Sequence, residues 1–107
     1  MKRALLAGGC LGILLGVGIP LTAAGDAKKG EMVFENCAVC HNADSTETKI
    51  GPGLKGIFKK DKLVNGKPVT EENVKALITD GTNAMPGFGD TITSEDKDNV
   101  IAYLKTL

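Results

Sequence analysis

The sequence NCAVCH, residues 36–41, is the most informative stretch of this chain. It places Cys37 and Cys40 three positions apart and follows the second at once with His41, the only histidine among 107 residues. A closely spaced cysteine pair can form a disulfide, a thioredoxin-like redox pair, part of a zinc site, or the attachment point of c-type haem. The neighbouring sequence bears on each of these interpretations.

Three of the four interpretations meet physical difficulties. A disulfide between Cys37 and Cys40 would close a very small loop and would contribute little stability. A thioredoxin-like pair follows a strand, whereas these thiols follow a helical pattern, and structural zinc needs four ligands where the motif supplies three. The C-x-x-C-H spacing favours haem, because each thiol can add to a vinyl group while the adjacent imidazole binds the iron. We therefore expect one covalent haem c per chain, with His41 as an axial ligand.

Apolar residues at helical spacing predict three helices around this motif. The first should begin after Asp26, which can cap it, and cover residues 27–38. The second should begin after Thr70 and stop at Gly81, since acidic residues follow the threonine and glycine favours a helix end. The third should begin after Thr93, whose hydroxyl can form a capping box, and run almost to the last residue.

The region between the first two predicted helices, residues 50–68, is dense in Gly, Pro and Lys. It predicts an ordered loop with one helical turn near residues 54–59. No alternating pattern predicts a strand, so the expected fold class is all-α. Three modest helices and four aromatic residues provide little apolar material, and domains this small usually need a further stabilising element. An apolar macrocycle at the centre would supply the missing core.

Residues 1–24 have the layout of a secretory signal peptide. Two basic residues precede an uncharged run of 21 residues that contains Pro20 and ends in small side chains at Ala24. We predict cleavage after Ala24, a mature domain of residues 25–107, and export to the periplasm. The alternative is an uncleaved anchor in the inner membrane, since such a run can cross a ~30 Å hydrocarbon layer. Membrane association is expected only in that case.

Methionine is the expected second axial ligand. Because the chain has one histidine, it cannot supply a bis-histidine pair. Met32 lies only five residues before Cys37 and is expected on the surface or in packing, whereas Met85 lies in the loop NAMPGFG, 44 residues beyond His41. That loop can reach the opposite face of the haem. Thioether sulfur is a soft ligand that favours ferrous iron and raises the reduction potential.

Four separated stretches resemble the class I mono-haem cytochromes c of bacteria, and the resemblance covers residues 26–107. The stretches are GEMVFENCAVCH at 30–41, GPGL at 51–54, MPGF at 85–88 and VIAYLKTL at 100–107. The resemblance implies a cytochrome c fold, in which three main helices and long loops wrap around one covalently bound haem.

The same resemblance assigns roles to individual residues. It implies that Gly30 and Phe34 meet Tyr103 where the first helix crosses the last. It also implies that the carbonyl of Pro52 accepts a hydrogen bond from the ring of the iron-bound histidine, and that Leu54 packs on the haem. Such outer contacts fix the tautomer and the orientation of the ligand.

The function expected from these features is one-electron transfer between redox proteins, without enzymatic activity. Alternatives are a haem c relay subunit of a larger oxidoreductase complex and a gas-binding or sensor haem protein. The charge after residue 24 is near −2, and this balance gives no support to nucleic-acid binding. Residues 49–67 carry six lysines and one aspartate, a local +5 that could guide transient docking of an acidic partner.

Overall fold

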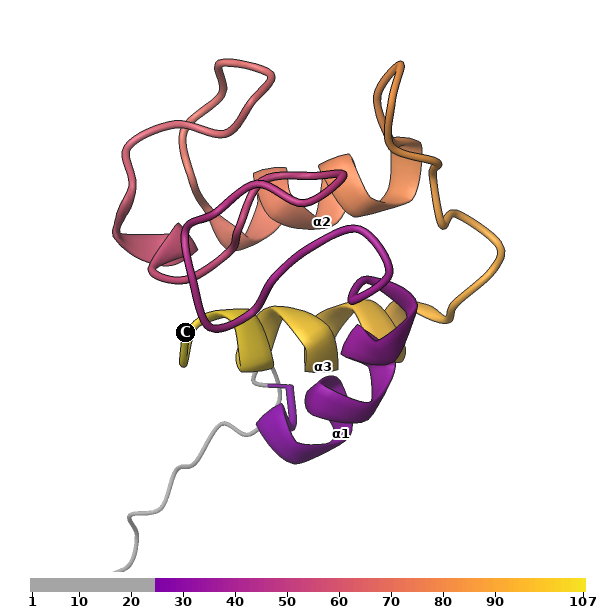
Figure 1. The fold of residues 1–107 in the computed structure, drawn as a ribbon. Coiled ribbons are helices and arrows are strands. Elements are labelled where there is room, and N and C mark those ends of the chain that lie inside the picture. The colour runs from indigo at the N-terminus through magenta and orange to yellow at the C-terminus, as the bar shows by residue number, and fades with distance from the viewer. Residues whose placement is uncertain (1–24) are drawn as a thin grey trace, which may run out of the picture.

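The computed structural model describes residues 25–107, and the predicted signal peptide with its cleavage site lies outside the described residues (Figure 1). Three α-helices are joined by long loops that contain two short 3-10 helices. Their bounds are α1 Ala27–Val33, η1 Phe34–Asn36, η2 Ile57–Lys59, α2 Glu71–Asp80 and α3 Ser94–Leu104. In this part of the chain the only β-type pairing is one isolated bridge between Lys62 and Pro68. The expected all-α class is confirmed.

The predicted helix boundaries agree with the caps that the structure contains. Asp26 accepts hydrogen bonds from two backbone N–H groups in the first turn of α1. Thr70 caps α2, which ends at Gly81 with a φ of 72°, a value that favours glycine. Thr93 and Asp96 form a capping box at the start of α3. The three helix starts therefore follow from capping side chains, and the end of α2 follows from the backbone conformation of a glycine.

The first helix is shorter than the predicted range 27–38. Regular α-helix ends at Val33, and the chain continues as the 3-10 helix η1 and then a turn. The N–H of Cys37 donates to the carbonyl of Phe34 at 2.7 Å, a bond three residues back rather than four. The apolar pattern continues through this tighter segment, so periodicity alone does not mark the change.

Helices α1 and α3 cross at close range, as expected (Figure 1). A Cβ atom on Gly30 would lie 1.9 Å from the carbonyl oxygen of Asn99 and 2.9 Å from Cβ of Tyr103. The rings of Phe34 and Tyr103 pack beside this point with centroids 5.4 Å apart. Glycine is therefore required at the crossing, because any side chain would push the two backbones apart.

The buried core is small, and it lies where α2, α3 and η1 meet the loop before α2. Its members are Phe34, Leu63, Val74, Ile78, Val100, Ile101 and Leu104. Further apolar side chains from the loops pack against it while remaining partly exposed.

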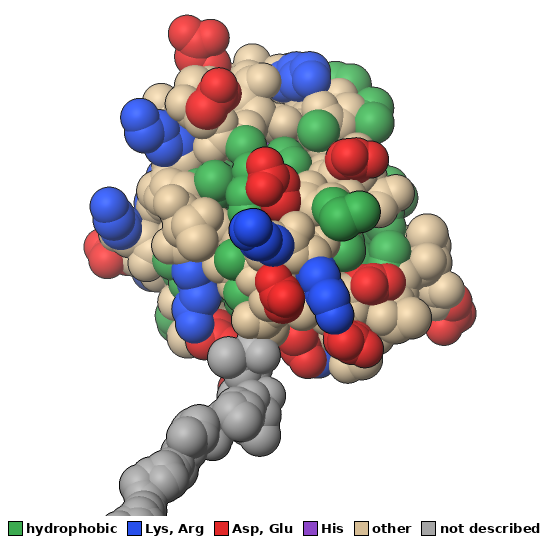
Figure 2. All heavy atoms as spheres, turned by 90° about the horizontal axis from the view of Figure 1, so that it is seen from below, with side chains coloured by type: hydrophobic (Ala, Val, Ile, Leu, Met, Phe, Trp, Pro, Cys, Tyr) green, Lys and Arg blue, Asp and Glu red, His purple; other side chains and the backbone are tan. Residues whose placement is uncertain are grey.

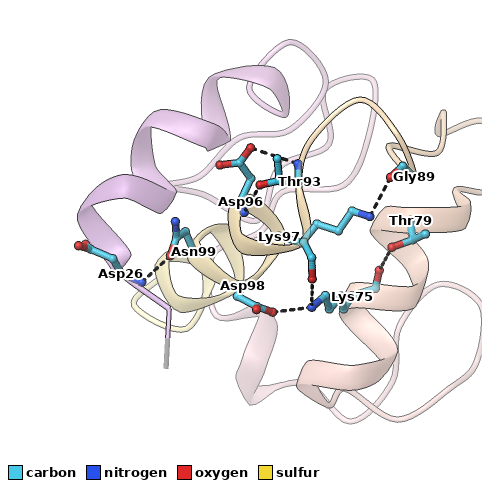
Figure 3. A network of polar contacts seen from close by, with 10 residues as sticks. Asp26, Lys75, Thr79, Gly89, Thr93, Asp96, Lys97, Asp98 and Asn99 are labelled. Atoms are coloured by element: carbon cyan, nitrogen blue, oxygen red, sulfur yellow. Dashed lines mark hydrogen bonds and ion pairs between the residues drawn. The ribbon is translucent and has the colours of Figure 1, made fainter. Parts of the chain in front are cut away.

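A polar network also joins the helices: Lys75 of α2 reaches Asp98 at 2.8 Å and Ser94 at 2.9 Å (Figure 3). Within residues 25–107 no helix is long and apolar enough to span a membrane.

Candidate haem-binding site

Cys37 and Cys40 lie on the helical turn that follows η1. The N–H groups of Cys40 and His41 donate to the carbonyl of Cys37 at 3.0 and 2.9 Å, so the turn presents all three side chains from one short segment. Both cysteines are free thiols and partly buried. Burial raises the pKa of the Cys37 thiol, and the neighbouring Cys40 raises it further. We call residues 37–41 the attachment turn.

The His41 ring is held by the GPGL segment. Its Nδ1 lies 2.7 Å from the carbonyl oxygen of Pro52. Since a carbonyl can only accept, Nδ1 carries the proton, and Nε2 keeps its lone pair available for a metal. This is the contact that the family resemblance implied.

Gly51 presses against the same ring, a contact that sequence reasoning missed. A Cβ atom on Gly51 would lie 2.5 Å from Cε1 of His41. The backbone is fixed there by the N–H of Gly51, which donates to the carbonyl of Cys40 at 2.7 Å. A glycine directly before the proline could have signalled such a close approach. The imidazole is thus confined by a backbone on one side and a hydrogen bond at one edge.

The loop between His41 and Leu54 folds back on the attachment turn. The N–H of Leu54 donates to the carbonyl of Asn42 at 2.8 Å, and Leu54 packs, partly buried, against the core. Lys49 Nζ donates to the carbonyl of Ala38 at 2.8 Å. Sequence reasoning assigned Lys49 only to the positive segment, whereas its ammonium group also ties the loop to the attachment turn.

Met85 lies in the loop between α2 and α3, separate from the attachment turn. Its side chain is partly buried and packs against the same core that Cys37 and Leu54 border. No hydrogen bond in the described chain joins Met85 directly to the attachment turn. Met32 is 70% exposed on α1, so of the two positions expected for it, surface or packing, the structure shows the surface.

The residues present fit haem c by their donor chemistry. Two free thiols can form thioethers, an imidazole nitrogen has an available lone pair, and a thioether sulfur borders the same apolar core. Residues 25–107 contain no group of three or more His, Cys, Asp or Glu side chains that could hold a metal ion.

Comparisons with known proteins agree with this donor set. The family model described as cytochrome C oxidase, cbb3-type, subunit III matches residues 25–104. Cytochrome c2 of Rhodospirillum rubrum is 31% identical over 134 residues, covering 100% of this chain and 99% of the relative. Cytochrome c6 of Picosynechococcus sp. is 36% identical over 98 residues, covering 88% and 83% respectively.

A solved structure gives the same result for the fold. Cytochrome c6 from the diatom Phaeodactylum tricornutum superposes with a TM-score of 0.62 and 35% sequence identity, covering 77% of this chain and 93% of that chain. The expected cytochrome c fold is thereby confirmed, together with covalent haem c as the cofactor of the family. The chain belongs to the class I mono-haem cytochromes c, and it is a one-electron carrier.

Proposed function

We propose that this chain is a periplasmic electron carrier in which Cys37 and Cys40 hold the haem through thioethers while His41 and Met85 bind its iron. The hydrogen bond from His41 Nδ1 to the Pro52 carbonyl is the observation that carries the proposal. It leaves Nε2 as the nitrogen with a free lone pair. When bound, haem c supplies an iron that gains and loses one electron.

The protein residues would orient the ligands and exclude competing chemistry. Gly51 and Pro52 would hold the His41 ring in one tautomer and one orientation, which strengthens it as a ligand. Leu54 would cover part of the haem with apolar surface. Met85 would occupy the position at which a small molecule could otherwise bind. No transformation of a substrate is part of this proposal.

The distal ligand can be tested with two methionine variants. We expect the oxidised protein to show the methionine-to-iron charge-transfer band, and we expect Met85→Ala to lose it and to bind carbon monoxide rapidly when reduced. Met32→Ala is the matched control, because Met32 is 70% exposed and should keep the band. A wild-type protein that lacks the band and binds carbon monoxide rapidly would instead favour the gas-binding alternative.

Redox proteins are the general kind of partner, and we propose that the positive segment, residues 49–67, docks an acidic one. Figure 2 shows the molecule from below relative to Figure 1, and on that face acidic and basic side chains are interspersed. That face therefore offers no patch of one sign to an acidic partner, in contrast to the sequence of residues 49–67. Lys59 and Lys60 are both exposed at the end of η2. Reversing both to glutamate should slow reduction by an acidic partner at low salt, and added salt should reduce the difference.

The control for this experiment is the double reversal of Lys28 and Lys29. These residues are adjacent and exposed on α1, so the net charge changes equally while residues 49–67 stay intact. Equal slowing by both double variants would show that only net charge matters. No slowing by either would mean that the segment is a solvated loop.

The family model that matches residues 25–104 describes an oxidase subunit, and this favours one alternative: a haem c relay within a larger complex. Size-exclusion chromatography of a native extract distinguishes the two. A free carrier elutes as a small haem protein, whereas co-elution of all the haem with a large complex would establish the relay.

Export remains a prediction, and mass spectrometry tests it: a mature chain beginning near Gly25 supports cleavage, and one beginning at Met1 supports the anchor.

A further inference from the structure

Residues 81–93 connect α2 to α3 and carry Met85, and the part of this loop after Met85 is fastened to both helices. The N–H of Phe88 donates to the carbonyl of Ile78 in α2 at 2.8 Å. The buried side chain of Lys97 in α3 donates to the carbonyl of Gly89 at 3.2 Å (Figure 3). Both contacts join residues after Met85 to the helices. The residues before Met85 are held by a different set of hydrogen bonds.

The first half of the loop is closed by Thr82. The backbone N–H of Thr82 donates to the carbonyl of Met85 at 2.9 Å. In the opposite direction, the backbone N–H of Met85 donates to Thr82 Oγ1 at 3.1 Å, and that of Ala84 donates to the same oxygen at 3.3 Å. Both backbone polar groups of Met85 are therefore bound to one residue. We call this pair of opposed bonds the Thr82 clasp.

The clasp is continuous with the end of α2. Gly81, which ends that helix, has a φ of 72°, and a Cβ atom on it would lie 2.4 Å from the carbonyl oxygen of Met85. The carbonyl that Thr82 binds thus rests directly on the helix terminus. Movement of the Met85 backbone would have to break the clasp or displace the last turn of α2.

We infer that Thr82 is a positioning residue for Met85 and sets how firmly its sulfur can be presented to the haem iron. The inference rests on the proposed role of Met85 as the distal ligand. A methionine side chain has three rotatable bonds and adapts easily, so the side chain alone does not fix the position of its sulfur. The two bonds to Thr82 fix the backbone from which the Met85 side chain starts, so that only its own side-chain torsions remain to be set when the sulfur reaches the iron.

The test is competition by free imidazole for the distal position of the oxidised protein. Thr82→Val keeps the shape of the side chain and removes the hydroxyl acceptor, and we expect imidazole to bind about fivefold more tightly, the factor that corresponds to one typical hydrogen bond. Thr82→Ser restores the acceptor and should behave like wild type. Thr91→Val is the matched control, because Thr91 is exposed in the same loop and its hydroxyl makes no hydrogen bond within residues 25–107.

Suppose that the wild-type protein shows the methionine-to-iron band. If the imidazole affinity of Thr82→Val is then within twofold of that of Thr91→Val, the inference about Thr82 is overturned, while Met85 remains the proposed ligand. A wild-type protein without that band would instead defeat the proposed ligation itself. Hydrogen exchange of the wild-type holoprotein supplies a second measurement that needs no variant. The Met85 amide should exchange more slowly than that of Asn83, which donates no hydrogen bond inside the described range. Equal exchange of the two amides would also overturn the inference.

Discussion

Gly30 in α1 provides a direct test of how the first and last helices are held together. In Gly30→Ala the new methyl would lie 1.9 Å from the Asn99 carbonyl oxygen, whereas ordinary contact begins near 3.4 Å. The helices would have to separate by about 1.5 Å, which forfeits half or more of the dispersion attraction between the atoms lining the gap. Overpacking of this kind costs about 3 kcal/mol. Alanine recovers about 1 kcal/mol over glycine within a helix, which leaves a net loss of about 2 kcal/mol.

For a domain of this size, a loss of about 2 kcal/mol lowers Tm by about 8–16 °C. The measurement is thermal unfolding of the holoprotein, followed by far-UV circular dichroism. Gly89→Ala is the matched control, because its methyl would lie 3.4 Å from the carbonyl of Thr79, an ordinary contact. A decrease in Gly30→Ala no larger than in this control would refute the claim that backbone contact sets the helix crossing.

Three further substitutions test the helix caps and the polar network. Thr93→Ala removes half of the capping box of α3 and should lower the free energy of unfolding in urea by about 1 kcal/mol, whereas an unchanged midpoint would contradict this role. Lys75→Met breaks the ion pair between Lys75 and Asp98, whose side chains are 34% and 46% exposed respectively. Calorimetry should show a loss of unfolding free energy of no more than about 1 kcal/mol, and a larger loss would contradict this weak role. Asn99→Ala leaves a backbone N–H at the start of α1 without its 2.8 Å acceptor and should cost about 1–3 kcal/mol by guanidinium unfolding; no loss would show that water replaces the amide oxygen.

The starts of the three helices and the end of α2 could be predicted because their causes lie within a few residues of each boundary. Thr70 caps the start of α2, and Thr93 caps the start of α3 with its capping partner Asp96 only three positions later. Gly81 ends α2 through its own backbone conformation. The set Cys37, Cys40 and His41 could be named as a haem attachment motif for the same reason, since its spacing is itself local, whereas the turn that carries it was predicted as helix up to residue 38.

The contacts that sequence reasoning missed depend on how the loop after the attachment turn folds back on it. Gly51 lies against His41, and Lys49 reaches the Ala38 carbonyl across 11 residues. Neither contact changes the hydrophobic period or the turn chemistry of its own segment, so no local pattern marks it. The Thr82 clasp spans only three residues, yet its importance depends on where Met85 stands relative to the core.

The two proposed axial ligands are secured in physically different ways. His41 is held by the turn that contains it and by a loop whose bond to it spans 11 residues, so its position depends mainly on local structure. Met85 rests on the end of α2, and its loop is tied to α3 through Lys97. Its position therefore depends on the packing of α2 against α3. A perturbation that loosens this packing should weaken Met85 ligation before it disturbs His41, which makes the Met85 loop the more sensitive half of the site.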